Sequence, residues 1–212
     1  MLKIFKQNPI IYKIYFFIIL FIFLYLIYAQ SLISMLWFCK ISLIFLLVAL
    51  LIDSDYLFSA VLISQGFVCL IFICELVGLV FFKYSLFNMA NLYTNTADWL
   101  ISIFYHVFTA LVPLHILILK KKFIKNSWLF VVSIFLISSI IIYILLFIFN
   151  LPYYSSINCV TLCYNSGVLT SIIVPIYNLF KLPYFILNTI GIGIIYYLIA
   201  IGFNYILNRN KK

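Results

Sequence analysis

Residues 56–82 read YLFSAVLISQGFVCLIFICELVGLVFF, a stretch that decides the fold class of this chain. The stretch holds one charged residue, Glu75, and no proline. It is longer than the roughly 20 apolar residues that a helix needs to cross the hydrocarbon core of a bilayer. Lipid offers the backbone no hydrogen-bond partners, and apolar residues that do not alternate with polar ones suit a helix, not a barrel strand. Residues 56–82 therefore predict a transmembrane helix.

Five further apolar stretches accompany this one, and each is about long enough to cross a bilayer. They are residues 11–28, 33–52, 99–119, 128–149 and 183–207. Hydrophobic residues make up 68% of the 212-residue chain, and only four residues are acidic, which is far more apolar than a soluble domain. We expect one all-α domain over residues 1–212, a polytopic transmembrane bundle of six spans.

The basic residues predict how the bundle is oriented. They cluster in residues 3–13, 120–125 and 209–212, and the cytoplasmic side of a membrane protein collects such clusters. All three clusters lie on one side only if an even number of crossings separates them. We therefore expect six crossings of the cell membrane with both termini cytoplasmic, and Lys40 toward the outside. Asp53 and Asp55 then share the basic side, but acidic residues count little in this rule.

Residues 150–182 interrupt the apolar pattern between the last two predicted helices. A seventh crossing there would carry the basic C-terminus outside, so we expect a partly buried or re-entrant outer segment, which membranes tolerate where protein covers the backbone. The interrupting residues are Pro152, Asn158, Asn165, Gly167, Pro175 and Asn178.

The net charge of +9 does not predict a nucleic-acid partner. The basic residues lie at predicted helix ends, where they match anionic lipid head groups, and no basic stripe with aromatics is present. We expect the lipid bilayer as the partner, with a small molecule or lipid as a further ligand. The first helix resembles a signal peptide that could be cleaved after Ala29, but its long apolar core favours a retained anchor.

The cysteines predict little chemistry. Cys39, Cys69 and Cys74 lie in predicted helices, where a thiol behaves as a small hydrophobic group. Cys159 and Cys163 lie in the outer segment, and their spacing leaves a disulfide open without favouring it. No zinc-type spacing of Cys and His is present, so we expect no metal site, and no cofactor is indicated.

Glu75 and His106 are the main candidates for a functional site. Glu75 is the one acidic residue well inside a predicted span, and an intramembrane carboxylate is costly unless it is paired, protonated or hydrated. Each residue lies about seven residues from the outer end of its helix, so we expect them at similar depth on adjacent antiparallel helices, within direct or one-water hydrogen-bond reach. Both residues also suit a purely structural role, as interhelical hydrogen-bonding groups.

Other polar residues are expected near this pair. Asn188 reaches a similar depth in the last predicted helix, Asn158 belongs to the outer segment above it, and Thr109 lies one turn after His106. His115 is nine residues after His106, which places it on the opposite face of the helix near the basic loop. We expect a site lined by Glu75, His106, Asn188, Asn158 and Thr109.

Several short motifs carry a resemblance to a family of uncharacterised bacterial multi-pass membrane proteins. The motifs extend from residue 36 to 160, and in that family an aspartate stands at the place of Glu75. The chain lacks the family's glycine–tyrosine–aspartate–arginine run in the loop at 120–125, and it has Cys159 in place of a tryptophan. The resemblance implies a bundle of about six spans and no known reaction. The motifs are Leu36-Trp37-Phe38-Cys39, Gln65, Glu75-Leu76, Phe104-Tyr105-His106, Pro113-Leu114 and Ile157-Asn158-Cys159-Val160.

Three classes of function fit these residues. The first is a carrier, channel or ligand-binding protein with a polar cavity in the outer half of the bundle. The second is a structural or assembly subunit whose polar residues only join helices. The third is an intramembrane lipid-modifying enzyme, with His106 as general base, Glu75 orienting it and Thr109, Ser102 or Cys159 as nucleophile. No catalytic residue is marked by its sequence context, so the first class is the favoured interpretation.

Overall fold

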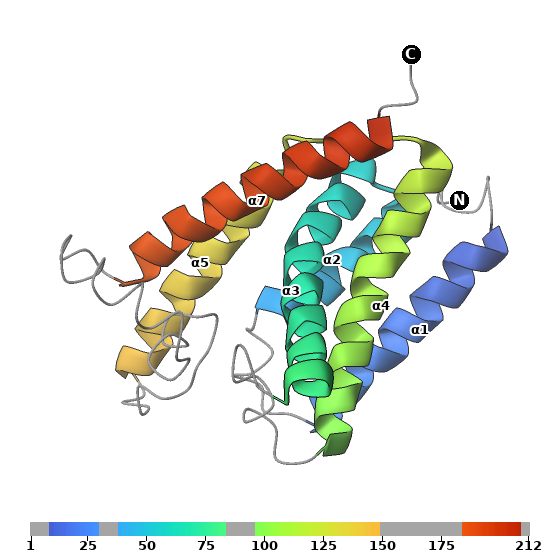
Figure 1. Ribbon diagram of the computed structural model, residues 1–212. Coiled ribbons are helices and arrows are strands. Elements are labelled where there is room, and N and C mark those ends of the chain that lie inside the picture. Colours follow the sequence, from blue (N-terminus) through green and yellow to red (C-terminus); the bar gives the residue numbers. More distant parts are fainter. Residues whose placement is uncertain (1–8, 30–37, 84–95, 149–183, 209–212) are drawn as a thin grey trace.

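The computed structural model describes residues 9–29, 38–83, 96–148 and 184–208. Within these ranges the regular structure is entirely helical, without a strand (Figure 1). Each predicted apolar stretch corresponds to one helix, although α2 begins at Phe38 and residues 30–37 lie outside the described part. The helices are α1 (Pro9–Ala29), α2 (Phe38–Ile52), α3 (Asp55–Phe82), α4 (Thr96–Lys120), α5 (Ser127–Ile148) and α7 (Tyr184–Asn208).

Helix α3 has a defined cap at each end. Ser54 precedes it in extended conformation, and the Ser54 hydroxyl accepts a hydrogen bond from the backbone N–H of Leu57 at 3.3 Å. The Asp55 carboxylate lies in the first turn, where it stabilises the positive end of the helix dipole. Lys83 ends the helix in a left-handed conformation, and its N–H bonds to the carbonyl oxygen of Gly78. These caps keep α3 continuous over a length sufficient to cross a bilayer.

Helix α3 is also the central helix of the bundle. It packs against α2, α4, α5 and α7, whereas α1 lies at the edge against α2 and α4 (Figure 1). Gly66 marks a close approach of α7, because a Cβ atom there would lie 3.3 Å from the Phe203 ring. The aromatic ring of Phe67 meets that of Tyr196 at the same crossing, with ring centroids 6.0 Å apart. Polar side chains on α3 are therefore surrounded by protein on most sides.

Successive helices run in opposite directions, so several chain segments meet at one end of the bundle. We call this the charged end, and it comprises the beginning of α1, the turn at 53–54, the loop at 121–126 and the end of α7. Tyr12 of α1 bonds Asp53 at 3.0 Å, and Asn208 of α7 donates to the carbonyl oxygen of Phe123 at 3.2 Å. The beginning of α1 and the end of α7 thus lie at the same end of the molecule (Figure 1).

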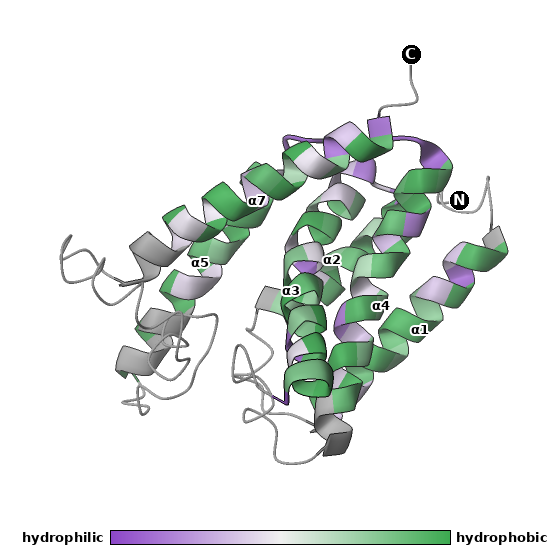
Figure 2. Cartoon of the chain, in the orientation of Figure 1, coloured by the Kyte–Doolittle hydropathy of each residue, from purple (hydrophilic) through white to green (hydrophobic). Residues whose placement is uncertain are grey.

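The outer faces of the helices are apolar. Large side chains such as Phe21, Val80 and Leu198 are more than half exposed, while hydrophilic residues gather at the charged end (Figure 2). Four helical stretches are long and apolar enough to cross a membrane: Ile10–Tyr28, Asp55–Phe82, Leu100–Lys120 and Thr189–Asn208. Two shorter apolar stretches, Cys39–Ile52 and Ser127–Ile141, lie beside them. An exposed surface this apolar suits lipid, so the fold is that of a helical membrane protein.

Candidate functional site

Glu75 and His106 lie on the facing sides of α3 and α4. The Glu75 side chain is fully buried, and His106 is 3% exposed. Phe72, one turn before Glu75 on the same face of α3, places its ring 4.4 Å from the His106 ring, measured between centroids. The expected approach of these two helix faces is therefore present. A bond between the carboxylate and the imidazole stays a prediction.

Three helices are joined by polar contacts beside this pair. Gln65 of α3 is fully buried, and its Nε2 donates to the carbonyl oxygen of Cys39 in α2 at 3.1 Å. Tyr105 of α4 donates its hydroxyl proton to the Cys39 sulfur at 3.1 Å. The Tyr105 and His106 rings also contact each other. We call Cys39, Gln65, Glu75, Tyr105, His106 and Thr109 the polar cluster.

Two buried atoms of the polar cluster have no hydrogen-bond partner among the described residues. They are Oε1 of Gln65 and Nδ1 of His106. A buried polar atom without a partner costs about 1–3 kcal/mol, so native structures hold few of them. The cluster therefore combines bonds that hold α2, α3 and α4 together with acceptor or donor positions that the described residues leave open.

Thr109 supplies a further polar group of α4. It is fully buried, and its hydroxyl donates to the carbonyl oxygen of Tyr105 one turn earlier. Pro113 lies inside the same helix, and it has no N–H to donate to the carbonyl oxygen of Thr109. Pro113 therefore leaves the carbonyl oxygen of Thr109 without its usual helical donor, at a level between the two histidines of α4.

The remaining predicted site residues are described in part or not at all. Asn188 belongs to α7, and only its backbone is described. Asn158 and the whole predicted re-entrant segment lie outside the described residues. His115 is exposed, and its Nδ1 lies 2.8 Å from the Tyr15 hydroxyl of α1, away from the polar cluster as expected.

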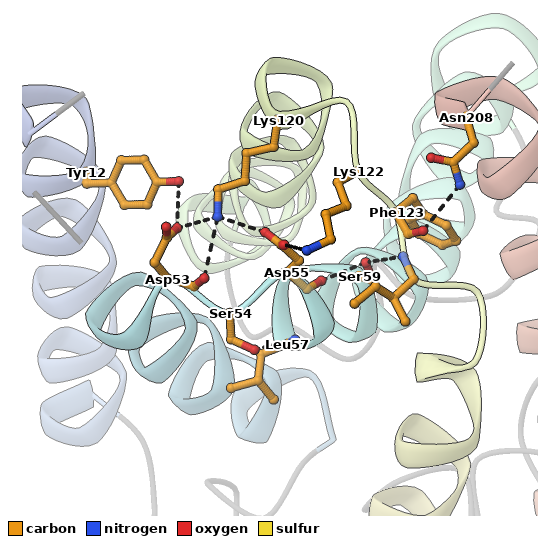
Figure 3. A network of polar contacts seen from close by, with 11 residues as sticks. Tyr12, Asp53, Ser54, Asp55, Leu57, Ser59, Lys120, Lys122, Phe123 and Asn208 are labelled. Atoms are coloured by element: carbon orange, nitrogen blue, oxygen red, sulfur yellow. Dashed lines mark hydrogen bonds and ion pairs between the residues drawn. The ribbon is translucent and has the colours of Figure 1, made fainter. Parts of the chain in front are cut away.

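The charged end holds a second polar site, which we call the charged network (Figure 3). Lys120 at the end of α4 forms ion pairs with Asp53 and with Asp55, the latter at 2.8 Å. Lys122 pairs with the other Asp55 oxygen at 2.5 Å, and Tyr12 donates its hydroxyl proton to Asp53. The network therefore connects α1, the turn before α3 and the loop after α4.

The backbone at the charged network is strained at two positions. Asp53 and Lys121 have φ angles of 53° and 48°, in the left-handed region that costs non-glycine residues about 1 kcal/mol or more. The first turn places Asp53 in the network, and the second lies between Lys120 and Lys122, which both belong to it. The hydrogen bond from Lys122 to the Asp55 carboxylate, with their mutual attraction, raises the pKa of Lys122 above its ordinary 10.5. The ion pairs of Lys120 and Lys122 thus lie directly beside both strained turns.

The sequence interpretation missed the charged network and part of the polar cluster. Asp53 and Asp55 were considered only as weak indicators of membrane orientation. Their predicted position on the same side as Lys120 was the signal that they pair with it. Gln65 lies inside a predicted span as Glu75 does, and it deserved the same weight. Lys40 lies in α2 beside Cys39 and is only 3% exposed, and its place on the outer side stays a prediction.

No family model matches the chain, and neither a curated protein nor a solved structure is significantly similar to it.

Proposed function

We propose that the protein crosses the cell membrane six times as a single domain, with both termini in the cytoplasm. Two observations support this topology. The beginning of α1 and the end of α7 share the charged end with the basic loop at 121–126, as an even number of crossings requires. Helix α5 begins at the charged end and α7 returns to it, which supports an outer segment at 150–182 that enters the membrane without crossing it.

We further propose that the polar cluster binds a small polar solute, as part of a carrier, a channel or a ligand-binding membrane protein. The carrying observation is the pair of buried atoms without a partner among the described residues, Gln65 Oε1 and His106 Nδ1, of which His106 lies near the buried Glu75 carboxyl. In lipid-embedded protein such atoms are costly, and ionisable groups at depth mark solute or ion pathways. A guest with hydrogen-bonding groups would satisfy both atoms.

One observation favours a structural or assembly subunit as the second candidate. The bonds of Gln65 and Tyr105 to Cys39 each join two helices, and interhelical bonds of this kind stabilise membrane bundles by about 0.6 kcal/mol on average. A subunit that only holds helices together needs such bonds. The unpartnered Gln65 Oε1 and His106 Nδ1 contribute nothing to such a structural role, so we place this function second.

A comparison of two substitutions at Glu75 tests the first candidate. Purified protein in vesicles is assayed for binding and flux of a panel of small polar solutes and lipids, and its thermal stability is measured in detergent. We expect Glu75→Gln to keep the stability, because amide and protonated carboxyl have nearly the same shape, and to lose the binding or flux. Ser138→Ala in α5 is the control, since that buried hydroxyl donates to the carbonyl oxygen of Phe135 in its own helix at 2.9 Å.

The same variants identify the structural alternative. If the polar cluster only joins helices, Glu75→Gln leaves every binding and flux signal unchanged, while Glu75→Leu lowers the thermal stability. That pair of results would replace the proposed solute site by a structural role.

A further inference from the structure

Helix α3 carries buried polar side chains from the charged network to the polar cluster. Asp55 begins the helix, and the side chains that follow it inward are 0–2% exposed. Asp55 and Glu75 are separated by about 30 Å along the helix at 1.5 Å per residue, and Glu75 lies about 10 Å short of the other helix end at Phe82. We call these side chains the α3 row: Asp55, Ser59, Ser64, Gln65 and Glu75.

Hydroxyl groups and a small cavity occupy the half of the row near the charged end. Ser59 accepts a hydrogen bond from the backbone N–H of Ile124 and donates to the carbonyl oxygen of Asp55 at 2.7 Å. Ser64 lies 3.1 Å from the Ser42 hydroxyl of α2. Between these two levels lies a cavity of about 10 Å³, lined by both Ser42 and Ser64. That space is about the size of one water molecule, and the Ser42 and Ser64 hydroxyls are its two polar lining groups among six apolar side chains.

Side chains from α4 occupy the other half of the row. Gln65 and Glu75 are ten residues apart, about 15 Å along the helix, too far for direct contact. Tyr105 reaches Cys39, the residue that also receives the Gln65 bond, and His106 lies against Phe72 near Glu75. Tyr105 and His106 of α4 therefore supply polar groups at the height where α3 has the apolar Phe72. The open Nδ1 of His106 and Oε1 of Gln65 lie in this half.

We propose that the α3 row is a proton pathway, so that the solute served by the polar cluster is the proton. This inference rests on the proposed solute site at Glu75 and His106. Protons enter through the Glu75 carboxyl, pass the imidazole, the hydroxyl groups and water, and leave at the Asp55 carboxylate. Each group accepts a proton on one lone pair and releases its own, so one transit moves one proton between the two aqueous sides. No electron is transferred, and no covalent bond other than O–H and N–H changes.

The charged network suits the inner end of such a pathway. The side chains of Asp53 and Asp55 are 28% and 15% exposed, so the carboxylates meet both the row and the aqueous phase. Burial raises the pKa of the Asp55 carboxyl, but the hydrogen bonds and charges of Lys120 and Lys122 outweigh this and hold that pKa below its ordinary value, so the carboxylate holds an arriving proton only weakly. A proton released here is therefore passed to solvent and not trapped in the bundle.

Substitutions of Ser64 test the pathway at the level of the small cavity. Purified protein is placed in vesicles that contain a pH-sensitive dye, and a potassium diffusion potential drives protons inward. Ser64→Val and Ser64→Thr have nearly the same shape, but only threonine keeps the hydroxyl. We expect the valine variant to lower the proton flux about tenfold or more and the threonine variant to keep it within about twofold. Ser138→Val, at a buried serine of α5 outside the row, is the matched control.

Several outcomes would overturn the pathway. The pathway is wrong if vesicles with the wild-type protein take up protons no faster than empty vesicles. It is also wrong if the Ser64→Val and Ser64→Thr variants have equal proton flux. If Ser64→Val does not fold, Ser42→Ala removes the partner hydroxyl from α2, and unchanged flux in that variant also overturns it.

The pathway and the solute site fail in different ways. If a solute binds or moves in a Glu75-dependent manner while the proton flux is absent, the pathway is wrong and the solute site remains. If Glu75→Gln changes neither solute signals nor proton flux, both proposals are wrong.

Discussion

The charged network and the polar cluster differ in how completely their polar groups are paired. At the charged end, Lys120 and Lys122 each meet a carboxylate although water has partial access there. In the polar cluster, Gln65 and His106 are buried, yet each keeps one atom without a partner among the described residues. The charged groups of the network are thus all paired, although water has partial access to them, whereas the polar cluster leaves two atoms open at depth. The difference indicates that the network holds the fold and that the cluster is arranged for a guest.

The strongest test of this contrast removes the central cation of the network. Lys120→Ala leaves Asp53 and Asp55 close together without the lysine that neutralises both, so we expect a loss of about 2 kcal/mol in the free energy of unfolding. Denaturant unfolding in detergent micelles measures it. The neighbouring exposed Lys121, changed to alanine, is the control and should lose little. Equal stability of the two variants would contradict a stabilising role for the network.

A smaller loss is expected when α1 is released from the same network. Tyr12→Phe removes the hydroxyl that bonds Asp53 at 3.0 Å and keeps the ring that packs on Phe58. The expected cost is about 1 kcal/mol in the same unfolding measurement. Tyr15→Phe, which removes an exposed bond to His115, serves for comparison and should cost less. A larger loss at Tyr15 would show that α1 is held mainly elsewhere.

Alkaline pH should weaken the network through Lys122. Its pKa is raised in the folded protein, so its contribution to stability is complete below the ordinary lysine pKa and is lost as the pH rises through the higher folded value. Arginine stays charged at that pH, so Lys122→Arg should keep more of its thermal stability than wild type between about pH 10 and 12. Parallel melting curves of the two proteins check this. Identical pH profiles would mean that the Asp55–Lys122 pair contributes nothing.

The smallest effect on stability is expected in the polar cluster. Gln65→Leu loses the bond to the Cys39 carbonyl but also removes the unpartnered Oε1, so the free energy of unfolding should change by less than about 0.5 kcal/mol. Proton or solute flux should fall in the same variant. A large loss of stability with unchanged flux would reverse the contrast and make the cluster the structural site.

Most of the helical fold could be predicted from the sequence because lipid imposes one simple rule. A long apolar run such as 56–82 must satisfy its backbone internally, and the described helix α3, Asp55–Phe82, begins one residue earlier and ends at the same residue. The burial of Glu75 and His106 followed from the same rule, since charged or polar groups avoid lipid. Helix positions and buried faces thus depend on local pattern alone.

The contacts between helices could not be predicted in the same way. Spacing along one helix places Gln65 on a face of α3, but it does not say that Cys39 of α2 offers the acceptor. The pairing of Lys120 with Asp53 and Asp55 depends on how far α4 and the turn before α3 extend at the charged end. Such pairings are set by the packing angles of whole helices, which depend on many side chains at once.

The charged network joins residues that are made at different times. Asp55 precedes Lys120 by 65 residues, so at ribosomal rates the carboxylate waits about 3 to 13 s for its lysine. Asp53 has the Tyr12 hydroxyl of α1 within reach during this interval, because α1 has already been made. The bond from Asn208 to Phe123 follows last, because Asn208 is made 85 residues after Phe123. The contacts of the charged end therefore form in the order of synthesis, first with α1, then with α4 and finally with α7.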